Sequence, residues 1–215
     1  MTSARKQHDR FWCGKPRCNQ RRFEAPSACD YDGMRQILKL QREEMGSRMD
    51  AALANIQRLP PEAFPMLPPV IAGVLRKRNC TVPQPWTEGG ARNVIQGEFC
   101  AKGQTGWAVL ASVEEWTELL VFRHANDLDP LVCCPAVGDE YYLYLDEDDN
   151  PIGYSRLLTT VDREYITEHV DREVVPELPY LDHDGINDAV IAHSSVTWYY
   201  QADEQLYLPT RRRKV

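Results

Sequence analysis

Apolar side chains repeat every three to four residues over 34–79, which predicts a helical segment. The residues that share this face are Ile37, Leu38, Met45, Met49, Leu53, Ile56 and Leu59. Such spacing is typical of an amphipathic helix packed against a core. Pro60 and Pro61 end the first helix, because proline cannot continue one. A second, shorter helix is predicted over 69–78, with proline in its first turn and basic residues at its C-terminal end.

From about residue 90 the pattern changes to short segments rich in Val, Tyr, Trp and Thr, separated by Gly, Asp, Asn or Pro. This composition predicts β-strands. The predicted strands are 93–99, 107–112, 119–123, 141–145, 153–160, 189–193, 196–200 and 205–208. The acidic run 146–151 is predicted as a hairpin tip, and 162–170 as a short helix capped by Thr160. Short turns between successive strands favour antiparallel pairing.

These patterns together predict an α+β fold in which N-terminal helices pack on a largely antiparallel, meandering β-sheet. We expect four regions along the chain. They are a basic, disordered leader at 1–33, a helical segment at 34–79, a β-rich domain at 90–209 and a basic tail at 210–215. The 215 residues are enough to bury a sizeable core, and the hydrophobic fraction of 43% is ordinary for a globular protein.

No apolar run reaches the roughly 18 residues that a membrane helix needs. The nearest one, 64–75, is interrupted by prolines and is followed, not preceded, by basic residues, the reverse of a secretory signal. We therefore expect a soluble, cytoplasmic bacterial protein with no membrane partner. Secretion is the alternative if the true start of the chain differs.

The net charge of −7 is unevenly distributed. Residues 1–22 sum to +6 and residues 211–214 to +4, which leaves −17 for residues 23–210. A body this acidic repels phosphate backbones, so nucleic acid is not the expected partner. The alternative is a nucleic-acid accessory protein that binds through its basic ends alone.

Three carboxylates surround a glycine turn that leads into an apolar strand. They belong to Asp182, Asp184 and Asp188, and the turn is at Gly185. Calcium binds six to eight oxygens, many of them carboxylate oxygens from a single loop. The sequence therefore predicts a calcium-stabilised loop with these three aspartates as its metal ligands.

The stretch 181–191 resembles the calcium loop of integrin-type FG-GAP repeats, in which an acidic glycine turn precedes a strand. This resemblance implies the same calcium ligands, except that Tyr180 occupies the family's first acidic position and supplies no carboxylate. Gly97-Glu98-Phe99 with the strand 107–110 is a second, weaker match. About 120 residues are too few for a propeller, so the resemblance implies a shared loop–strand motif and not the propeller fold. Without a metal, Asp184-Gly185 would be a tight turn and Asp188 would cap a backbone amide.

Seven cysteines, an odd number at irregular spacing, argue against a disulfide framework and for reduced thiols. In the leader, four potential zinc ligands are separated by gaps wider than those of zinc sites, so we expect no zinc there. They are His8, Cys13, Cys18 and Cys29. The adjacent Cys133 and Cys134 are expected to be small packing residues at a strand or loop edge.

The chain contains neither a Gly-x-Ser-x-Gly elbow nor a phosphate-binding glycine loop, and its histidines are scattered. The expected function is a non-catalytic binding domain for a protein or small-molecule partner. Tyr141–Tyr144 and Trp198–Tyr200 place aromatic rings on both faces of their strands, and we expect these rings to serve core packing and cross-strand pairing. The alternative is that one face fills the core and the other is an exposed surface that recognises a carbohydrate or protein partner. The alternative is a hydrolase whose site is assembled from distant residues, such as Cys100 with His193 or the carboxylates of the β-rich region.

Overall fold

The computed structural model of the protein describes residues 46–87, 89–145, 151–201 and 204–210. Within these ranges the chain forms three α-helices, two 3-10 turns and twelve strands. The helices are α2 (Ser47–Asn55), α3 (Pro69–Lys77) and α4 (Arg163–His169), and the 3-10 turns are η1 (Pro61–Ala63) and η2 (Asp139–Tyr142). No helix of the described ranges is long and apolar enough to cross a membrane.

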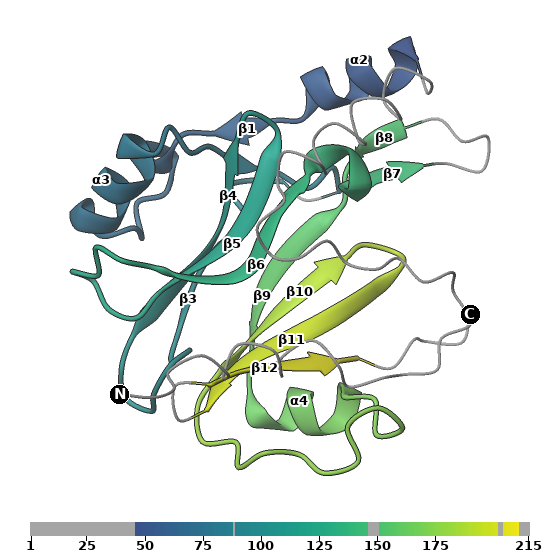
Figure 1. Cartoon of the computed structure of the whole chain (residues 1–215). Helices are drawn as coiled ribbons and strands as arrows, with labels where there is room; N and C mark the ends of the chain where they lie inside the picture. The colour runs from purple at the N-terminus through teal and green to yellow at the C-terminus, as the bar shows by residue number, and fades with distance from the viewer. Residues whose placement is uncertain (1–45, 88, 146–150, 202–203, 211–215) are drawn as a thin grey trace, which may run out of the picture.

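Two four-stranded antiparallel sheets make up most of the molecule (Figure 1). The N-terminal sheet has the order β3-β4-β5-β6, and the C-terminal sheet the order β12-β11-β10-β9. The strands of the N-terminal sheet are β3 (Val94–Gly97), β4 (Gly106–Val113), β5 (Trp116–Phe122) and β6 (Leu131–Gly138). Those of the C-terminal sheet are β9 (Arg156–Val161), β10 (Gly185–Val190), β11 (Ser194–Gln201) and β12 (Glu204–Pro209).

Two short antiparallel ribbons complete the strand list. One pairs β1 (Arg58–Leu59) with β2 (Val82–Pro83), and the other pairs β7 (Leu143–Leu145) with β8 (Pro151–Tyr154). The β7–β8 ribbon flanks the acidic run that the sequence predicts as a hairpin tip. The tip itself lies outside the described residues.

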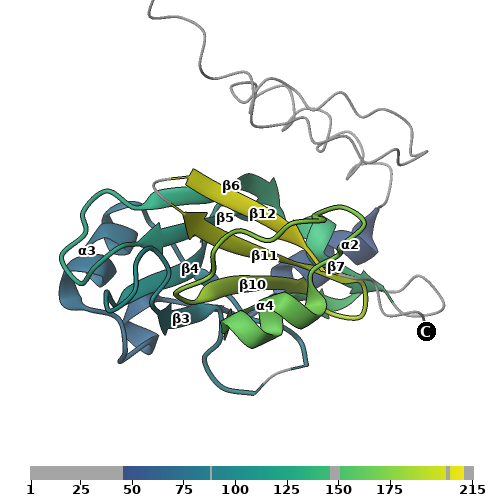
Figure 2. The same cartoon turned by 90° about the horizontal axis from the view of Figure 1, so that it is seen from below.

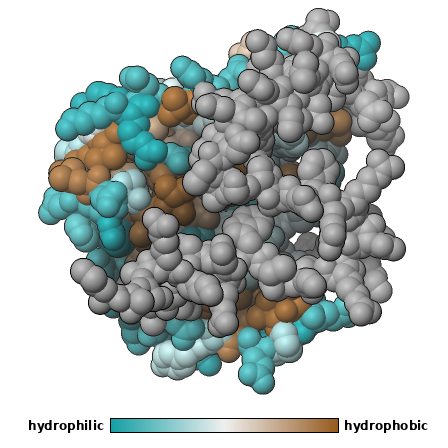
Figure 3. Space-filling view, viewed as in Figure 1, coloured by the Kyte–Doolittle hydropathy of each residue, from teal (hydrophilic) through white to brown (hydrophobic). Residues whose placement is uncertain are grey.

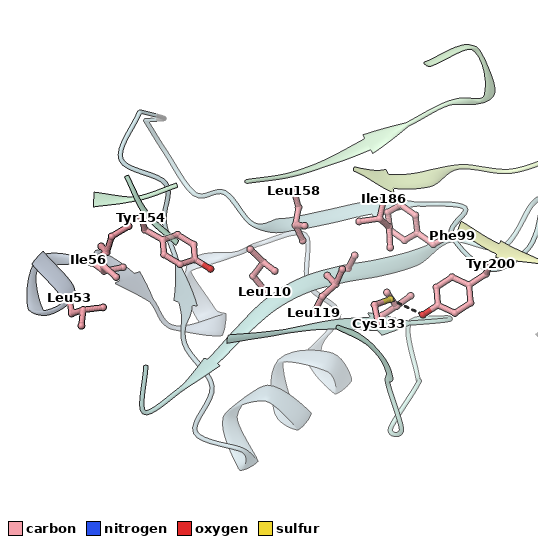
Figure 4. Close-up of a cluster of buried hydrophobic side chains, with 13 residues drawn as sticks. Leu53, Ile56, Phe99, Leu110, Leu119, Cys133, Tyr154, Leu158, Ile186 and Tyr200 are labelled. Atoms are coloured by element: carbon pink, nitrogen blue, oxygen red, sulfur yellow. Dashed lines mark hydrogen bonds between the residues drawn. The ribbon is translucent and has the colours of Figure 1, made fainter. Parts of the chain in front are cut away.

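The main core is formed between the two sheets (Figure 4). Leu110 and Leu119 from the N-terminal sheet join Leu158 and Ile186 from the C-terminal sheet in one buried cluster. β4 and β5 are buried along nearly their whole length, because successive side chains point to opposite faces and one face enters this cluster while the other is covered by α3.

The sheets also contact through polar groups at their β6 and β12 edges. Cys133 and Tyr200 meet at the end of the main core, with 2.7 Å between thiol and hydroxyl (Figure 4). The Gln205 side-chain amide donates a hydrogen bond of 2.6 Å to the Cys133 carbonyl.

Helices cover the outer faces of the sheets (Figures 1 and 2). Ile71 and Leu75 of α3 are buried in a second cluster with Trp107 and other residues of the N-terminal sheet. Ile166 of α4 is buried in a third cluster with Tyr199 and other residues of the C-terminal sheet. The order of layers is therefore helix, sheet, sheet, helix. Figure 3 shows hydrophobic patches on the side where α3 lies and others near the bottom of the view, with hydrophilic residues around them.

The α+β class and the antiparallel pairing predicted from the sequence are confirmed. The strands, however, form separate sheets and not one meander. The first helix ends at Asn55, because the next residues leave it to pair as β1 with β2. The predicted strand 153–160 is divided at Ser155 into β8 and β9, and the first two residues of the predicted strand 141–145 belong to η2. The predicted strand 189–193 is shifted, since β10 spans Gly185–Val190, and β1, β2 and β6 were not predicted.

The cap of α4 is Asp162, whose carboxylate accepts a hydrogen bond of 2.8 Å from the Tyr165 amide, and Thr160 instead belongs to β9. Cys133 and Cys134 lie in β6, which is the edge strand of the N-terminal sheet. The leader 1–33 and the tail residues 211–215 lie outside the described residues, so the expectations for them, including the leader's zinc ligands, stay predictions.

Candidate functional site

The acidic segment 181–184 lies immediately before β10, and its two solvent-side aspartates bind different partners. The tight turn predicted at Asp184-Gly185 is not found, because Gly185 is the first residue of β10 and pairs with Val161 of β9. Asp182 interacts with Tyr199: its amide donates a hydrogen bond of 3.0 Å to the tyrosine hydroxyl, which donates one of 3.3 Å to the Asp182 carboxylate. His183 stacks on the same tyrosine ring, with 4.3 Å between ring centroids. Burial raises the pKa of Tyr199, so this hydroxyl stays protonated and able to donate.

Asp184 joins the acidic segment 181–184 to Glu98, the residue that follows β3. Its carboxylate accepts a hydrogen bond of 2.9 Å from the Glu98 amide, and its own amide donates one of 3.1 Å to the Glu98 carbonyl. Gly97 permits this close approach, since a Cβ atom there would lie 3.0 Å from the Asp184 carboxylate and 2.9 Å from a Thr160 methyl carbon. The two segments that resemble FG-GAP loops are thus in direct contact.

Asp188 lies within β10 and faces the space between the two sheets. Arg156 of β9 binds its carboxylate with two hydrogen bonds of 2.8 and 2.6 Å. The Trp198 indole contributes a third, of 3.3 Å. Only 1% of the Arg156 side chain and 7% of the Asp188 side chain are exposed. This is a buried, bidentate ion pair that joins two strands.

The guanidinium of Arg156 has a second neighbour in the ring of Tyr142, whose centroid is 4.8 Å from Cζ. Burial alone would lower the pKa of Arg156, but the charge and hydrogen bonds of Asp188 raise it well above its usual value. Arg156 is therefore a fixed cation. Burial raises the pKa of Tyr142 to about 12, although the nearby Arg156 opposes that rise.

The three predicted calcium ligands are thus bound by three different groups of the protein. Among the residues that the structure describes, no group of three or more His, Cys, Asp and Glu side chains is placed to hold a metal ion. The role of Asp188 as a backbone cap is not found, because its carboxylate accepts from two side chains. Calcium binding stays a prediction, and calorimetric titration with calcium, with Asp182→Asn as the control, tests it.

Cys100, the thiol considered for nucleophilic catalysis, is half-buried, and Cys133 and Cys134 are buried and half-buried. Burial raises the pKa of Cys133 and of Cys134, and a raised pKa disfavours the reactive thiolate. Cys100 is half-buried and packs against the main core. His193 is exposed in the turn between β10 and β11 and contacts an aromatic ring.

The aromatic strands do place rings on both faces, as expected from the sequence. Trp198 and Tyr200 face the main core between the sheets, whereas Tyr199 faces α4 on the other side. Tyr142 packs against the main core, and Tyr144, two residues later, does not belong to it. The ring of Tyr144 stacks on that of Trp86.

Three rings from distant parts of the sequence form a surface that we call the aromatic row: Trp86, Tyr144 and His193. Trp86 and Tyr144 stack with 5.3 Å between centroids and an angle of 21°, and the His193 ring lies 6.2 Å from that of Tyr144. Trp86 is 43% exposed, and His193 is exposed as well. The row therefore leaves part of its aromatic surface in solvent.

The β7–β8 ribbon positions this row. Tyr144 pairs with Gly153 across the ribbon, and a Cβ atom on Gly153 would lie only 2.8 Å from the Trp86 Cβ. The Trp86 amide also donates a hydrogen bond of 2.9 Å to the Tyr154 carbonyl. The missing side chain at 153 is therefore what lets the tryptophan lie across the ribbon.

A buried carboxylate fixes η2, the 3-10 turn that leads into β7. Asp139 is fully buried and accepts hydrogen bonds from Arg58 at 2.7 Å, from Ser112 at 3.2 Å and from the Thr117 hydroxyl. Burial raises the pKa of Asp139, while these donors oppose the rise. Asp139 thus connects the β1, β4 and β5 strands to the base of the ribbon that carries Tyr144.

Sequence reasoning identified Tyr144 as part of an aromatic strand but missed Trp86. The available signal was weak: a tryptophan in a proline-containing loop, Pro83-Gln84-Pro85-Trp86, outside every predicted element. A large ring in a loop has no strand or helix face that would direct it into the core.

No protein-family model, no curated protein and no solved structure matches this chain. The resemblance to FG-GAP loops therefore stays a prediction about two short segments.

Proposed function

We propose that this chain is a non-catalytic binding domain that recognises a protein partner through the aromatic row. The observation that carries the proposal is the stack of Trp86 on Tyr144 with 43% of the tryptophan left in solvent. Exposed tryptophan and tyrosine rings dominate the binding energy of protein interfaces, because they bury much apolar area at little cost in conformational entropy.

The rigidity of the row supports the same role. Trp86 is fixed by a backbone hydrogen bond and by contact with Gly153, and Tyr144 belongs to a paired strand. A surface held in one conformation before binding loses little entropy when a partner arrives. The row is therefore preorganised for contact.

Three carboxylates of the β-rich region are engaged by other groups of the fold. Asp188 is neutralised by Arg156, Asp184 is bound to the Glu98 backbone, and Asp139 accepts from three side chains. These contacts join strands and sheets, which supports a structural role for each carboxylate.

Selection from a random peptide library displayed on phage tests the proposal. We expect enriched peptides whose binding to the protein falls at least tenfold in Trp86→Ala, about 1.4 kcal/mol or more. The matched control is Tyr180→Ala, which removes another exposed aromatic ring, 74% in solvent, that is not part of the row.

Two results would contradict it. One is the absence of enriched peptides, and the other is peptide binding that is equal in the wild-type protein and in Trp86→Ala. A glycan array probed in parallel gives a third: glycan binding that depends on Trp86, without peptide binding, would assign the row to carbohydrate.

A further inference from the structure

The space between the two sheets is closed at one end of β12 and open further along the strand. It is closed at Gln205, because this side chain donates a hydrogen bond to the Cys133 carbonyl of β6. Two residues later, Tyr207 lies on the same face of β12, yet it is 58% exposed. A ring on the inner face of a sandwich is buried wherever the second sheet covers it. The N-terminal sheet therefore does not cover β12 at Tyr207, and a cleft opens there between the sheets.

Aromatic rings line this cleft. The Tyr207 ring meets that of Trp198, its cross-strand partner, edge to face, with 5.2 Å between the ring centroids. Trp198 is half-buried and packs against the main core. Leu206 and Leu208, on either side of Tyr207, belong instead to the third cluster on the α4 side. The two rings therefore point into the space between the sheets, and from Trp198 the cleft leads to Asp188, which accepts the indole N–H.

An unused hydrogen-bond donor lies at the inner end of the cleft. Nε and Nη2 of Arg156 bind the two carboxylate oxygens of Asp188. Nη1, on the other side of the guanidinium, is buried and has no hydrogen-bond partner among the described residues. The Tyr142 ring and the Cys134 thiol lie beside this guanidinium, and both side chains are half-buried. A thiol is only a weak acceptor, and a charged donor left unsatisfied costs free energy, so a good acceptor that reached Nη1 would be held strongly.

The charge of the pair decides which acceptor fits. Arg156 and Asp188 neutralise each other, and only 1% and 7% of their side chains are exposed. A ligand carboxylate on Nη1 would place a second anion beside Asp188 at low dielectric constant, and an ammonium group would be repelled by Arg156. A neutral carbonyl oxygen satisfies the donor without adding charge. The rings of Tyr207 and Trp198 favour an aromatic group on the same ligand.

We propose that this cleft binds a small, neutral aromatic compound that carries a carbonyl group, such as an aromatic amide. Its ring packs on Tyr207 and Trp198, and its carbonyl oxygen accepts a hydrogen bond from Nη1 of Arg156. The half-buried Cys134 side chain changes rotamer to admit the carbonyl. The cleft shares no residue with the aromatic row, so this inference is independent of the proposed function.

The probe is benzamide, and its binding is followed through the Trp198 indole N–H resonance in NMR spectra of the full-length protein. This resonance is identified by its loss in Trp198→Phe. We expect it to shift saturably with a Kd on the order of 1 mM, the range for a ligand of this size. Benzoate and benzylamine carry the same ring and should bind at least tenfold more weakly, because each adds a charge. The Trp86 resonance is the internal control and stays in place.

Two variants locate the bound probe. Tyr207→Ala removes one ring of the cleft and should weaken benzamide binding about fivefold, whereas Tyr180→Ala removes an exposed ring elsewhere and should leave it unchanged. The double variant Arg156→Met with Asp188→Leu removes the donor without leaving a buried charge unpaired, a kind of replacement that folded proteins tolerate. It should weaken benzamide binding at least tenfold, with its folding checked by circular dichroism and thermal unfolding.

Three results would overturn the inference. The first is a Trp198 resonance that does not move with benzamide, whether or not the Trp86 resonance shifts. The second is equal affinity for benzamide and benzoate, and the third is unchanged benzamide binding in Tyr207→Ala. None of them bears on the selection of peptides that need Trp86, so the cleft and the aromatic row can fail separately.

Discussion

Two regions differ in what their side chains contact: the acidic segment 181–184 together with Asp188, and the aromatic row. The carboxylates of the first region each bind a donor of the protein: Tyr199, the Glu98 amide or Arg156. The rings of the second region contact one another and solvent. The sequence makes these three aspartates candidates for metal binding, but in the fold their carboxylates join strands and sheets. The loop tryptophan, which no sequence pattern singled out, remains partly exposed to solvent.

The largest effect is expected from breaking the buried pair. Asp188→Asn leaves the charge of Arg156 buried without its counter-ion, which should cost about 3–5 kcal/mol of unfolding free energy in urea. The control is Glu62→Gln, which breaks the exposed pair of Glu62 with Arg76 and should leave the urea midpoint unchanged. Equal midpoints for the two variants would show that the Asp188 pair is not a structural element.

The next effect concerns how the row is built. Gly153→Ala places a methyl group against Trp86 and should cost about 1–3 kcal/mol, together with a shift of the Trp86 indole resonance. Gly89→Ala is the matched control, because nothing lies within 4 Å of a Cβ atom there. An unshifted indole resonance in Gly153→Ala would mean that the ribbon does not position the tryptophan.

A pH series extends the comparison to another carboxylate of the fold. Burial raises the pKa of Asp127, but hydrogen bonds from Arg123 and from backbone amides outweigh it and lower the value from 3.8 to about 2. Because the folded pKa is depressed, the stabilisation is complete above about pH 4 and is lost as the pH falls toward 2. We expect the difference in urea midpoint between wild type and Asp127→Asn to shrink over this window. A difference that is constant from pH 6 to pH 2 would contradict the depressed pKa.

The smallest effect on stability is expected at the row itself. Trp86→Ala removes a ring that is already 43% exposed and should cost about 1 kcal/mol, mainly its stacking on Tyr144. The same variant should lose partner binding. A loss of several kcal/mol in thermal or urea unfolding would instead make Trp86 a core residue and would remove the contrast between the two regions.

Local patterns in the sequence were enough for the class of the fold and for most of its strands. They failed for β6, whose sequence Leu-Val-Cys-Cys-Pro contains a proline and no alternation of polar and apolar residues. An edge strand tolerates proline because one side of its backbone needs no partner. The two facing sheets were missed for a similar reason, since alternation gives the buried face of a strand but not the sheet to which it belongs.

The candidate site was harder to predict because its partners are far apart in sequence. Asp188 was read as a metal ligand or a backbone cap, and its actual partner Arg156 is 32 residues away. Trp86 and Tyr144 are also joined only by the fold. Residue type indicated which side chains could carry charge or stack, but only tertiary contacts determine which of them are already engaged.

The Gln205 side chain that bonds to the Cys133 carbonyl has a consequence for behaviour at high concentration. β6 is the last strand of its sheet, and an exposed terminal strand can recruit a strand from a second molecule and so start aggregation. Here one backbone acceptor of that strand is already occupied, and Pro135 offers no N–H to an incoming chain. The molecule thereby carries protection against polymerisation at this end of its sheet.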